Sequence, residues 1–308
     1  MGAIEVRDLF KYYKGSSYPA LRGIDLILDT GEVLGLTGHN GAGKSTLMGV
    51  INGSLAMSSG VVRFDGVDLT PMLARRCTAT MDQMHAPLKG VTPSSAIRVA
   101  AEIRGASQSA ADRITNTLLE YFEISEYADV RSEELSGGVR RLVAFCMCEC
   151  QGARTSLLDE PTNDVDPRRR KLLWSYIREQ ATGGRSYIVS THNVGEVSQY
   201  TDHQVVLSNG SVVYDGSSLS RASSHGNNVY VDVQGSCKLE ALVGKLGFDR
   251  VRLHGNQLVV PRQHVERVIG LLMDDGEEGR NTVIQISRTP GFEALYDELA
   301  RGEDYHGH

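Results

Sequence analysis

The sequence has 308 residues, of which 41% are hydrophobic, and it carries a formal net charge of −6 with a pI near 5.9. This length predicts one large domain, or a large domain followed by a small one, and an acidic balance without a run of basic residues argues against a nucleic-acid-binding surface. Because no apolar run approaches the ~18 residues of a membrane span and residues 1–10 lack a signal-peptide core, we expect a soluble, intracellular chain.

Two strands are predicted at the start of the chain, over residues 3–8 and 21–29, the second from its alternating apolar positions. The polar loop between them carries Tyr12 and Tyr13. A tyrosine upstream of a phosphate-binding loop can stack on an adenine ring, or it can simply pack on the surface. The residues of this loop alone leave both interpretations open.

A phosphate-binding loop follows, because residues 38–46 match the pattern G-x-x-x-x-G-K-[ST] in full. Its glycines allow the backbone to curl so that successive N–H groups point into one hollow. Lys44 can reach the β- and γ-phosphates of a nucleotide, and the Ser45 hydroxyl can bind Mg²⁺. A buried strand is predicted over 32–37 and a helix directly after the loop, whose positive end would face the phosphates. The sequence therefore predicts a nucleotide site.

The middle of the chain reads as a hairpin and a helical insertion. The Asp65-Gly66 pair predicts a turn between two short strands, and a further strand over 78–82 leads to Gln83. Helix-period apolar patterns cover residues 93–105 and 110–122, so we expect a helical insertion over about residues 85–150. It closes at Ser136-Gly137-Gly138, ahead of a helix predicted from Val139.

Three of the five cysteines, Cys146, Cys148 and Cys150, alternate at the end of this insertion. A metal site is one interpretation, but zinc sites usually combine two C-x₂₋₄-C pairs. We favour buried thiols, because free cysteine behaves as a small core residue.

Two acids close the next predicted strand, which covers residues 155–160. The carboxyl end of such a strand lies beside the phosphate loop, where Asp159 can hold Mg²⁺ and Glu160 can orient or deprotonate a water molecule. The strand over 186–190 leads to His192, which can hydrogen-bond a γ-phosphate. A last hairpin is predicted around Asn209-Gly210.

The composition changes after Gly216. Residues 217–228 are polar and rich in serine, as expected of a linker. Residues 229–308 read as strand, helix, strand, strand, helix and strand, followed by a closing helix, which predicts a small α+β domain of ferredoxin-like type. The predicted strands are 229–233, 251–254, 257–260 and 282–287, and the predicted helices are 238–246, 264–273 and 291–301. A regulatory role for this tail and a purely structural one both remain open.

Taken in order, these motifs resemble those of the ATP-binding subunit of ABC transporters, over residues 4–216. Tyr13 matches the adenine-stacking aromatic, residues 38–46 the Walker A loop, and Gln83 the glutamine of the Q-loop. Leu135-Ser136-Gly137-Gly138-Val139 matches the signature, and Leu158-Asp159-Glu160-Pro161 the end of Walker B. Residues 163–166 match the D-loop, and His192 matches the switch histidine. Residues 289–296 are similar to a C-terminal helix motif of drug- and polymer-exporting members.

The resemblance implies an α/β fold with a P-loop NTPase (RecA-like) core over residues 1–216, which includes an antiparallel β subdomain and the helical subdomain. It also implies ATP and Mg²⁺ as cofactors and Lys44, Glu160 and His192 as catalytic residues. The implied nucleotide contacts are Tyr13, Gly38, His39, Asn40, Gly41, Ala42, Gly43, Lys44, Ser45, Thr46, Gln83, Ser136, Gly137, Gly138 and Asp166. The implied Mg²⁺ ligands are Ser45, Gln83 and Asp159.

The partners implied by the resemblance are a second copy of the chain, or a paralogous ATPase subunit, and an integral-membrane permease. Each phosphate loop would be completed by Ser136, Gly137 and Gly138 of the other subunit. The permease would dock near Gln83, in a groove formed by residues 84–90, and the chain would sit at the inner face of the cell membrane. No nucleic-acid partner is expected.

Two features depart from the family pattern. Val139 stands in the signature where glutamine is usual, and Thr155 and Ser156 occupy Walker B positions where aliphatic residues are expected. Buried hydroxyls in a central strand need hydrogen-bond partners, so the structure must supply them.

An exporter ATPase is the function that we expect, and it stands against three alternatives. An importer ATPase with a regulatory C-terminal domain would also carry a small α+β tail, but the closing helix after Thr289 favours export. A soluble, non-transport ABC ATPase usually has two cassettes, long coiled coils or basic arms, none of which the sequence contains. A degenerate cassette is disfavoured because Lys44, Asp159, Glu160 and His192 are all present.

Overall fold

The computed structural model describes residues 3–83, 89–216, 228–234, 252–254, 257–261, 264, 268 and 282–287. The chain forms two compact units, Met1–Asp215 and Gly216–His308, which are described separately below.

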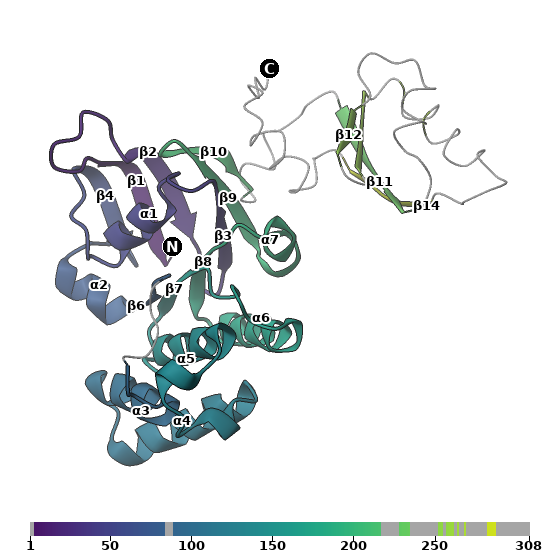
Figure 1. The fold of residues 1–308 in the computed structure, drawn as a ribbon. Coiled ribbons are helices and arrows are strands. Elements are labelled where there is room, and N and C mark those ends of the chain that lie inside the picture. Colours follow the sequence, from purple (N-terminus) through teal and green to yellow (C-terminus); the bar gives the residue numbers. More distant parts are fainter. Residues whose placement is uncertain are drawn as a thin grey trace. The chain divides into compact units, whose positions relative to one another are not determined.

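The first unit contains two sheets (Figure 1). An antiparallel sheet has the order β2-β1-β4-β5, and a six-stranded sheet has the order β10-β9-β3-β8-β7-β6. All neighbouring strands of the six-stranded sheet are parallel except β10, which pairs antiparallel with β9. The bounds are β1 Ile4–Lys11, β2 Leu21–Leu28, β3 Val33–Thr37, β4 Ser59–Phe64, β5 Val67–Asp68, β6 Thr78–Met81, β7 Thr155–Asp159, β8 Ser186–Ser190, β9 His203–Ser208 and β10 Ser211–Asp215.

The helices begin where the sequence supplies caps. Side-chain oxygens of Thr70, Thr92, Ser107, Ser136, Asp166 and Asn193 accept first-turn N–H groups, and proline occupies the first turn of α2, α3 and α6. The bounds are α1 Lys44–Ile51, α2 Pro71–Cys77, α3 Pro93–Ile103, α4 Gln108–Tyr121, α5 Gly137–Glu149, α6 Pro167–Thr182 and α7 Val194–Tyr200, with 3-10 turns η1 Ser125–Tyr127 and η2 Ser132–Glu134. The predicted helical insertion is confirmed as α3, α4 and α5, which Figure 1 shows grouped on the far side of the six-stranded sheet from β1, β2 and β4.

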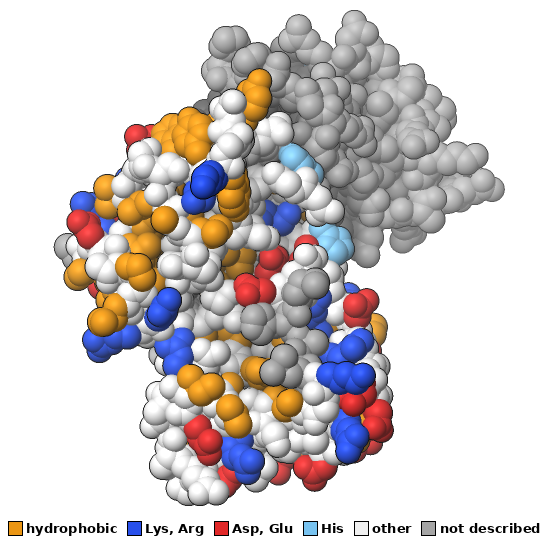
Figure 2. All heavy atoms as spheres, turned by 60° about the vertical axis from the view of Figure 1, so that its left-hand side comes forward, with side chains coloured by type: hydrophobic (Ala, Val, Ile, Leu, Met, Phe, Trp, Pro, Cys, Tyr) orange, Lys and Arg blue, Asp and Glu red, His pale blue; other side chains and the backbone are white. Residues whose placement is uncertain are grey.

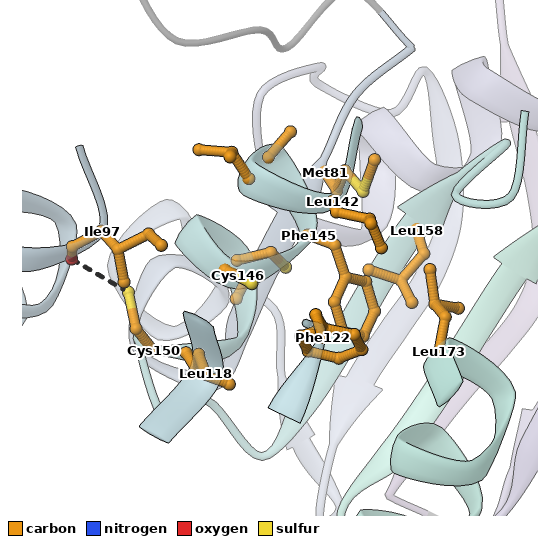
Figure 3. Packing of buried hydrophobic residues seen from close by; sticks show 14 of the residues in the cluster. Met81, Ile97, Leu118, Phe122, Leu142, Phe145, Cys146, Cys150, Leu158 and Leu173 are labelled. Carbon is orange, nitrogen blue, oxygen red and sulfur yellow. Dashed lines mark hydrogen bonds between the residues drawn. The ribbon is translucent and has the colours of Figure 1, made fainter. Parts of the chain in front are cut away.

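Hydrophobic residues cover both faces of the six-stranded sheet. Successive side chains of a strand point to opposite faces, so Leu157 joins the core between the two sheets and α1, whereas Leu158 joins the core beneath α5 and α6. Figure 3 shows Leu158 in this second core with Leu142 and Phe145 of α5. Burial on both faces is expected of a parallel sheet, and it leaves the strand ends as the place for polar chemistry.

The hairpin turns and the burial of the cysteines agree with the predictions made from the sequence. Asp65 and Gly66 have φ of 48° and 81°, and Asn209 and Gly210 have 49° and 80°, as the tight hairpin turn requires. Both hairpin predictions are confirmed. The expectation of buried thiols is also confirmed, because the three alternating cysteines are 0%, 2% and 8% exposed. In the described part of the chain no three His, Cys, Asp or Glu side chains cluster as they would around a metal ion, and no helix combines a membrane span's length with its hydrophobicity.

The second unit contains a four-stranded antiparallel sheet of order β12-β13-β11-β14. Its strands are β11 Asn228–Gln234, β12 Arg252–His254, β13 Gln257–Pro261 and β14 Thr282–Ser287. The four predicted strands are therefore confirmed, each end within one residue. The predicted tail helices lie almost entirely outside the described residues, as do nearly all of the linker residues 217–228.

A buried histidine gives the first unit a pH-dependent contribution to stability. The His203 side chain, 2% exposed, places Nε2 2.6 Å from Asp215 Oδ1 and Nδ1 3.4 Å from Glu32 Oε1. Burial opposes its protonation, but the hydrogen bonds and charges of Asp215 and Glu32 outweigh it and raise the pKa of His203 from 6.5 to about 9. The contribution to the free energy of unfolding is therefore fully present below pH 6.5 and is lost as the pH rises through about 9.

We expect the urea midpoint to fall across this pH window. Fluorescence of Trp174, the single tryptophan and a fully buried side chain, reports the transition. The fall should be smaller in His203→Gln, since glutamine does not titrate. Identical pH dependence in the two proteins would contradict the assignment to His203.

Candidate functional site

The phosphate loop lies between β3 and α1, as the sequence predicts. Only glycine fits at position 38, because an added Cβ would lie 2.3 Å from the Leu207 carbonyl oxygen and the φ angle there is +149°. Gly43 has φ of +109° and forms the left-handed N-cap of α1. Lys44 Nζ donates to the carbonyl oxygens of Gly38 at 2.6 Å and His39 at 3.3 Å, so the lysine lies over its own loop. Burial lowers the pKa of Lys44, against the opposing pull of nearby carboxylates.

A hydroxyl and a carboxylate meet beside this loop. Ser45 Oγ donates to Asp159 Oδ2 at 2.9 Å across a separation of 114 residues, and Ser190 Oγ of β8 donates to the other carboxylate oxygen. Mg²⁺ in nucleotide sites takes one or two protein oxygens and completes its shell with phosphate oxygens and water. The hydroxyl of Ser45 and the carboxylate of Asp159 fit that ion.

Glu160 follows β7 in an unusual backbone conformation. Its φ is +52°, its N–H donates to the Ser190 carbonyl oxygen at 2.9 Å, and its side chain is 9% exposed. Both carboxylate oxygens lie 3.0 Å from Nδ1 of His192, whose side chain is 68% exposed. The left-handed conformation is uncommon for a non-glycine residue, and here it accompanies an acid held by a histidine at the carboxyl end of β7.

Several of these groups line an open cavity of about 460 Å³, whereas Gly38, His39 and His192 are not among its lining residues. In Figure 2 acidic side chains gather in the middle of the face shown, near histidine side chains. The cavity is lined by Tyr13, Ala20, Asn40, Gly41, Ala42, Gly43, Lys44, Ser45, Thr46, Gln83, Asp159 and Glu160. Tyr13, rather than Tyr12, is among them, and its hydroxyl lies 3.1 Å from Thr46 Oγ1.

The signature residues lie elsewhere in the first unit. Ser136 and Gly137 are exposed at the start of α5, where Ser136 Oγ accepts the Val139 N–H at 3.3 Å. A Cβ on Gly138 would lie 2.4 Å from the Asp164 carbonyl oxygen. Neither the signature tip nor Asp166 lines the cavity.

Asp166 has a partner within its own chain. Its Oδ1 accepts the N–H groups of Arg168 at 3.1 Å and Arg169 at 3.0 Å, and so caps α6. The docking groove predicted over residues 84–90 lies mostly outside the described residues, although Gln83, which precedes it, is exposed and lines the cavity.

Sequence reasoning missed the groups that brace the site. Ser190, which holds Asp159, is one of them. Glu196 of α7 is another, because its Oε2 accepts from Thr162 Oγ1 at 2.7 Å and from Trp174 Nε1 at 3.2 Å. The sequence signal for these two residues was only that a polar residue lies beside a motif. Their hydrogen-bond partners cannot be inferred from spacing along the chain. Val139 is buried, so the residue that replaces the usual glutamine packs in the core.

Known proteins resemble this chain over most of its length. Residues 21–163 match the family model described as ABC transporter. The chain is 29% identical over 294 residues to the daunorubicin/doxorubicin resistance ATP-binding protein DrrA of Streptomyces peucetius, a match that covers 93% of this chain and 86% of that protein. It is 30% identical over 218 residues to ATP-binding cassette sub-family A member 7 of Rattus norvegicus, covering 70% of this chain and 10% of that protein. A solved ATP-binding subunit of an ABC transporter is 26% identical with a TM-score of 0.66, covering 80% of this chain and 100% of that one.

Proposed function

The chain belongs to the ABC transporter family of ATP-binding proteins, of the drug-exporter-like type, and we propose that it hydrolyses ATP to drive a separate membrane permease in export. The observation that carries the proposal is the cavity in which Lys44, Ser45, Asp159 and Glu160 converge. The relative that aligns over 93% of the chain is named for drug resistance, which favours export over import.

Within one chain the cavity residues divide the work of phosphoryl transfer. Tyr13 stacks on adenine, the loop of residues 38–46 holds the phosphates, and Lys44 offsets their charge. Ser45, Asp159 and Gln83 would hold Mg²⁺, which would supply neutralisation of the charge on the phosphate oxygens.

The acid at the end of β7 then acts on water. Glu160 accepts a proton from the attacking water molecule. His192, in contact with both of its carboxylate oxygens, keeps the acid in place and reaches toward the γ-phosphate. The low exposure of Glu160 keeps bulk water from competing for that carboxylate.

A second copy completes the site. Ser136 and Gly137 are exposed and line no part of their own chain's cavity. The N-terminus of α5 presents free N–H groups to a phosphate. We therefore assign Ser136, Gly137 and Gly138 to the nucleotide of the partner copy, with Asp166 close to the same junction.

Mixing two inactive variants tests this arrangement. Lys44→Ala disables the loop of one chain. Ser136→Asp keeps a good N-cap but places a negative charge against the partner's phosphates. Each variant alone should hydrolyse little ATP, whereas a mixture forms heterodimers with one unaltered pair, Lys44 from one chain and Ser136 from the other. Recovery of activity on mixing is expected, and the absence of recovery would contradict the two-copy site.

The remaining assignments concern the periphery. We propose that residues 1–216 form the ATP-binding domain, 217–228 a linker, and 229–308 a ferredoxin-like domain. The tail sheet supports this, since β11 and β12 run in the same direction on either side of β13, and β13 and β14 do so on either side of β11, as two interleaved βαβ units require. The permease would dock beside Gln83, so that the chain lies on the cytoplasmic face of the membrane.

A further inference from the structure

A buried ion pair lies at the opposite end of β7 from the nucleotide cavity. Glu149 Oε2 accepts from Arg185 Nη1 at 2.9 Å and from the Tyr187 hydroxyl at 2.9 Å, and its Oε1 accepts from Ser156 Oγ at 2.8 Å. Arg185 also donates to Ser156 Oγ at 3.2 Å and to the Ala153 carbonyl oxygen at 3.1 Å. The Glu149 side chain is 0% exposed and that of Arg185 is 17% exposed. We call these four side chains, Glu149, Ser156, Arg185 and Tyr187, the charge cluster.

The charge cluster accounts for one departure from the family pattern. Ser156 occupies a Walker B position where an aliphatic residue is expected, and its hydroxyl both donates to Glu149 and accepts from Arg185. The polar residue in the central strand is therefore satisfied by two residues from other elements. Burial raises the pKa of Glu149, whereas Arg185 and the two hydroxyl donors lower it.

The charge cluster joins the far ends of three elements whose near ends carry the proposed site. Helix α5 begins after Ser136 and ends at Glu149, β7 leads to Asp159 and Glu160, and β8 leads to His192. At 1.5 Å per residue α5 is about 20 Å long, so a tilt of about 5° at its last residue would move the signature tip by nearly 2 Å.

Apolar packing alone would fix the orientation of α5 less strictly than the hydrogen bonds of the charge cluster do. Apart from Gly138, which lies against the main chain of Asp164, the other buried contacts of α5 come from side chains such as Leu142, Phe145 and Cys146. Hydrophobic contact is not directional. A buried ion pair adds little net stability compared with apolar residues of the same volume. The ion pair does, however, favour the single orientation of α5 in which all of its hydrogen bonds are made at once.

We propose that Glu149 is a positioning residue for ATP hydrolysis: through Arg185 and Ser156 it fixes the angle between α5, which presents the signature serine, and β7, which presents the catalytic acid. This inference rests on the proposed function, because the signature tip matters only if a second copy's nucleotide is placed against it. Glu149 does not line the nucleotide cavity, so its effect is on turnover and not on the binding of ATP.

Glu149→Gln is the direct test. The amide oxygen still accepts from one hydroxyl, but the charge that holds Arg185 is lost. We expect kcat to fall at least about fivefold while KM for ATP changes less than about twofold, at a temperature where Trp174 fluorescence shows the variant folded. Glu5→Gln is the matched control, because its carboxylate pairs with Arg7 on the exposed surface of β1, and it should leave both constants unchanged. An unchanged kcat for Glu149→Gln would overturn the inference.

The mixed-chain assay separates this inference from the proposed function. Glu149→Gln is added to the Lys44→Ala chain, whose own loop is already disabled but whose Ser136 serves the active site of the mixture. Activity should drop relative to the mixture without the third substitution. If the original mixture shows no recovery, the two-copy function fails. If it recovers and Glu149→Gln has no effect in this position, the positioning role fails.

A second variant covers the case in which the single one does not fold. Replacing all four side chains with apolar ones (Glu149→Leu, Ser156→Ala, Arg185→Leu, Tyr187→Phe) leaves no buried charge unpaired. The inference predicts a folded protein with reduced kcat, and a folded protein with full kcat would overturn it.

Discussion

Glu160→Gln is expected to leave ATP binding intact and to slow hydrolysis by about 10²–10⁴-fold, the usual contribution of a positioned general base. Glutamine has the shape of the acid and can still contact His192 Nδ1, but its amide cannot take a proton from water. The Glu160 side chain is almost fully buried, and its backbone is left-handed, with φ of +52°. The other carboxylate that lines the cavity is Asp159. It cannot replace Glu160 as the base, because it already accepts hydrogen bonds from two hydroxyls.

Single-turnover hydrolysis and a fluorescent-nucleotide titration measure the two quantities separately. Glu120→Gln, on the exposed surface of α4, is the matched control and should behave as the unaltered protein. Hydrolysis at the normal rate in Glu160→Gln would remove this residue from the mechanism and would direct attention to His192.

Lys44→Ala should reduce kcat/KM by about 10²–10³-fold, the range seen when one preorganised donor to developing charge is removed. The loss has two physical sources. The ammonium no longer offsets phosphate charge, and the hydrogen bonds to the carbonyl oxygens of Gly38 and His39, which brace the loop, disappear.

ATP hydrolysis and nucleotide affinity should therefore both fall, in contrast to Glu160→Gln, where affinity is kept. Lys171→Ala removes an exposed lysine from α6 and controls for the change in net charge. Full activity in Lys44→Ala would show that residues 38–46 do not hold the phosphates.

Local signals predicted most of the first unit's sheet and the nucleotide loop. Strand β3, the loop and α1 follow from a buried apolar run, a glycine pattern and a helix start, all within about 20 residues. Helix α6 was not among the predicted elements. Its first turn holds three arginines, although Asp166 as N-cap and Pro167 in the first turn are the signals of a helix start.

The supporting shell of the site was not predictable in the same way. Ser190 and Glu149 carry ordinary polar side chains in a predicted strand and a predicted helix, and Glu196 lies in a segment for which no element was predicted. Each finds its partner more than five residues away on another segment. A sequence pattern records periodicity along one segment. It does not record which two segments will lie face to face, so a buried carboxylate and its donors become visible only in the folded chain.

The absent side chain at Gly138 has a mechanical consequence. A Cβ at this position would lie only 2.4 Å from the Asp164 carbonyl oxygen. The main chains of Gly138 and Asp164 therefore pack directly against each other, with no side chain between them. A movement of the turn that follows Glu160 should therefore displace the start of α5, because no side chain between the two can rearrange to absorb it. In the proposed two-copy site, this contact would couple movement at Glu160 to the position of Ser136 against the nucleotide of the second copy.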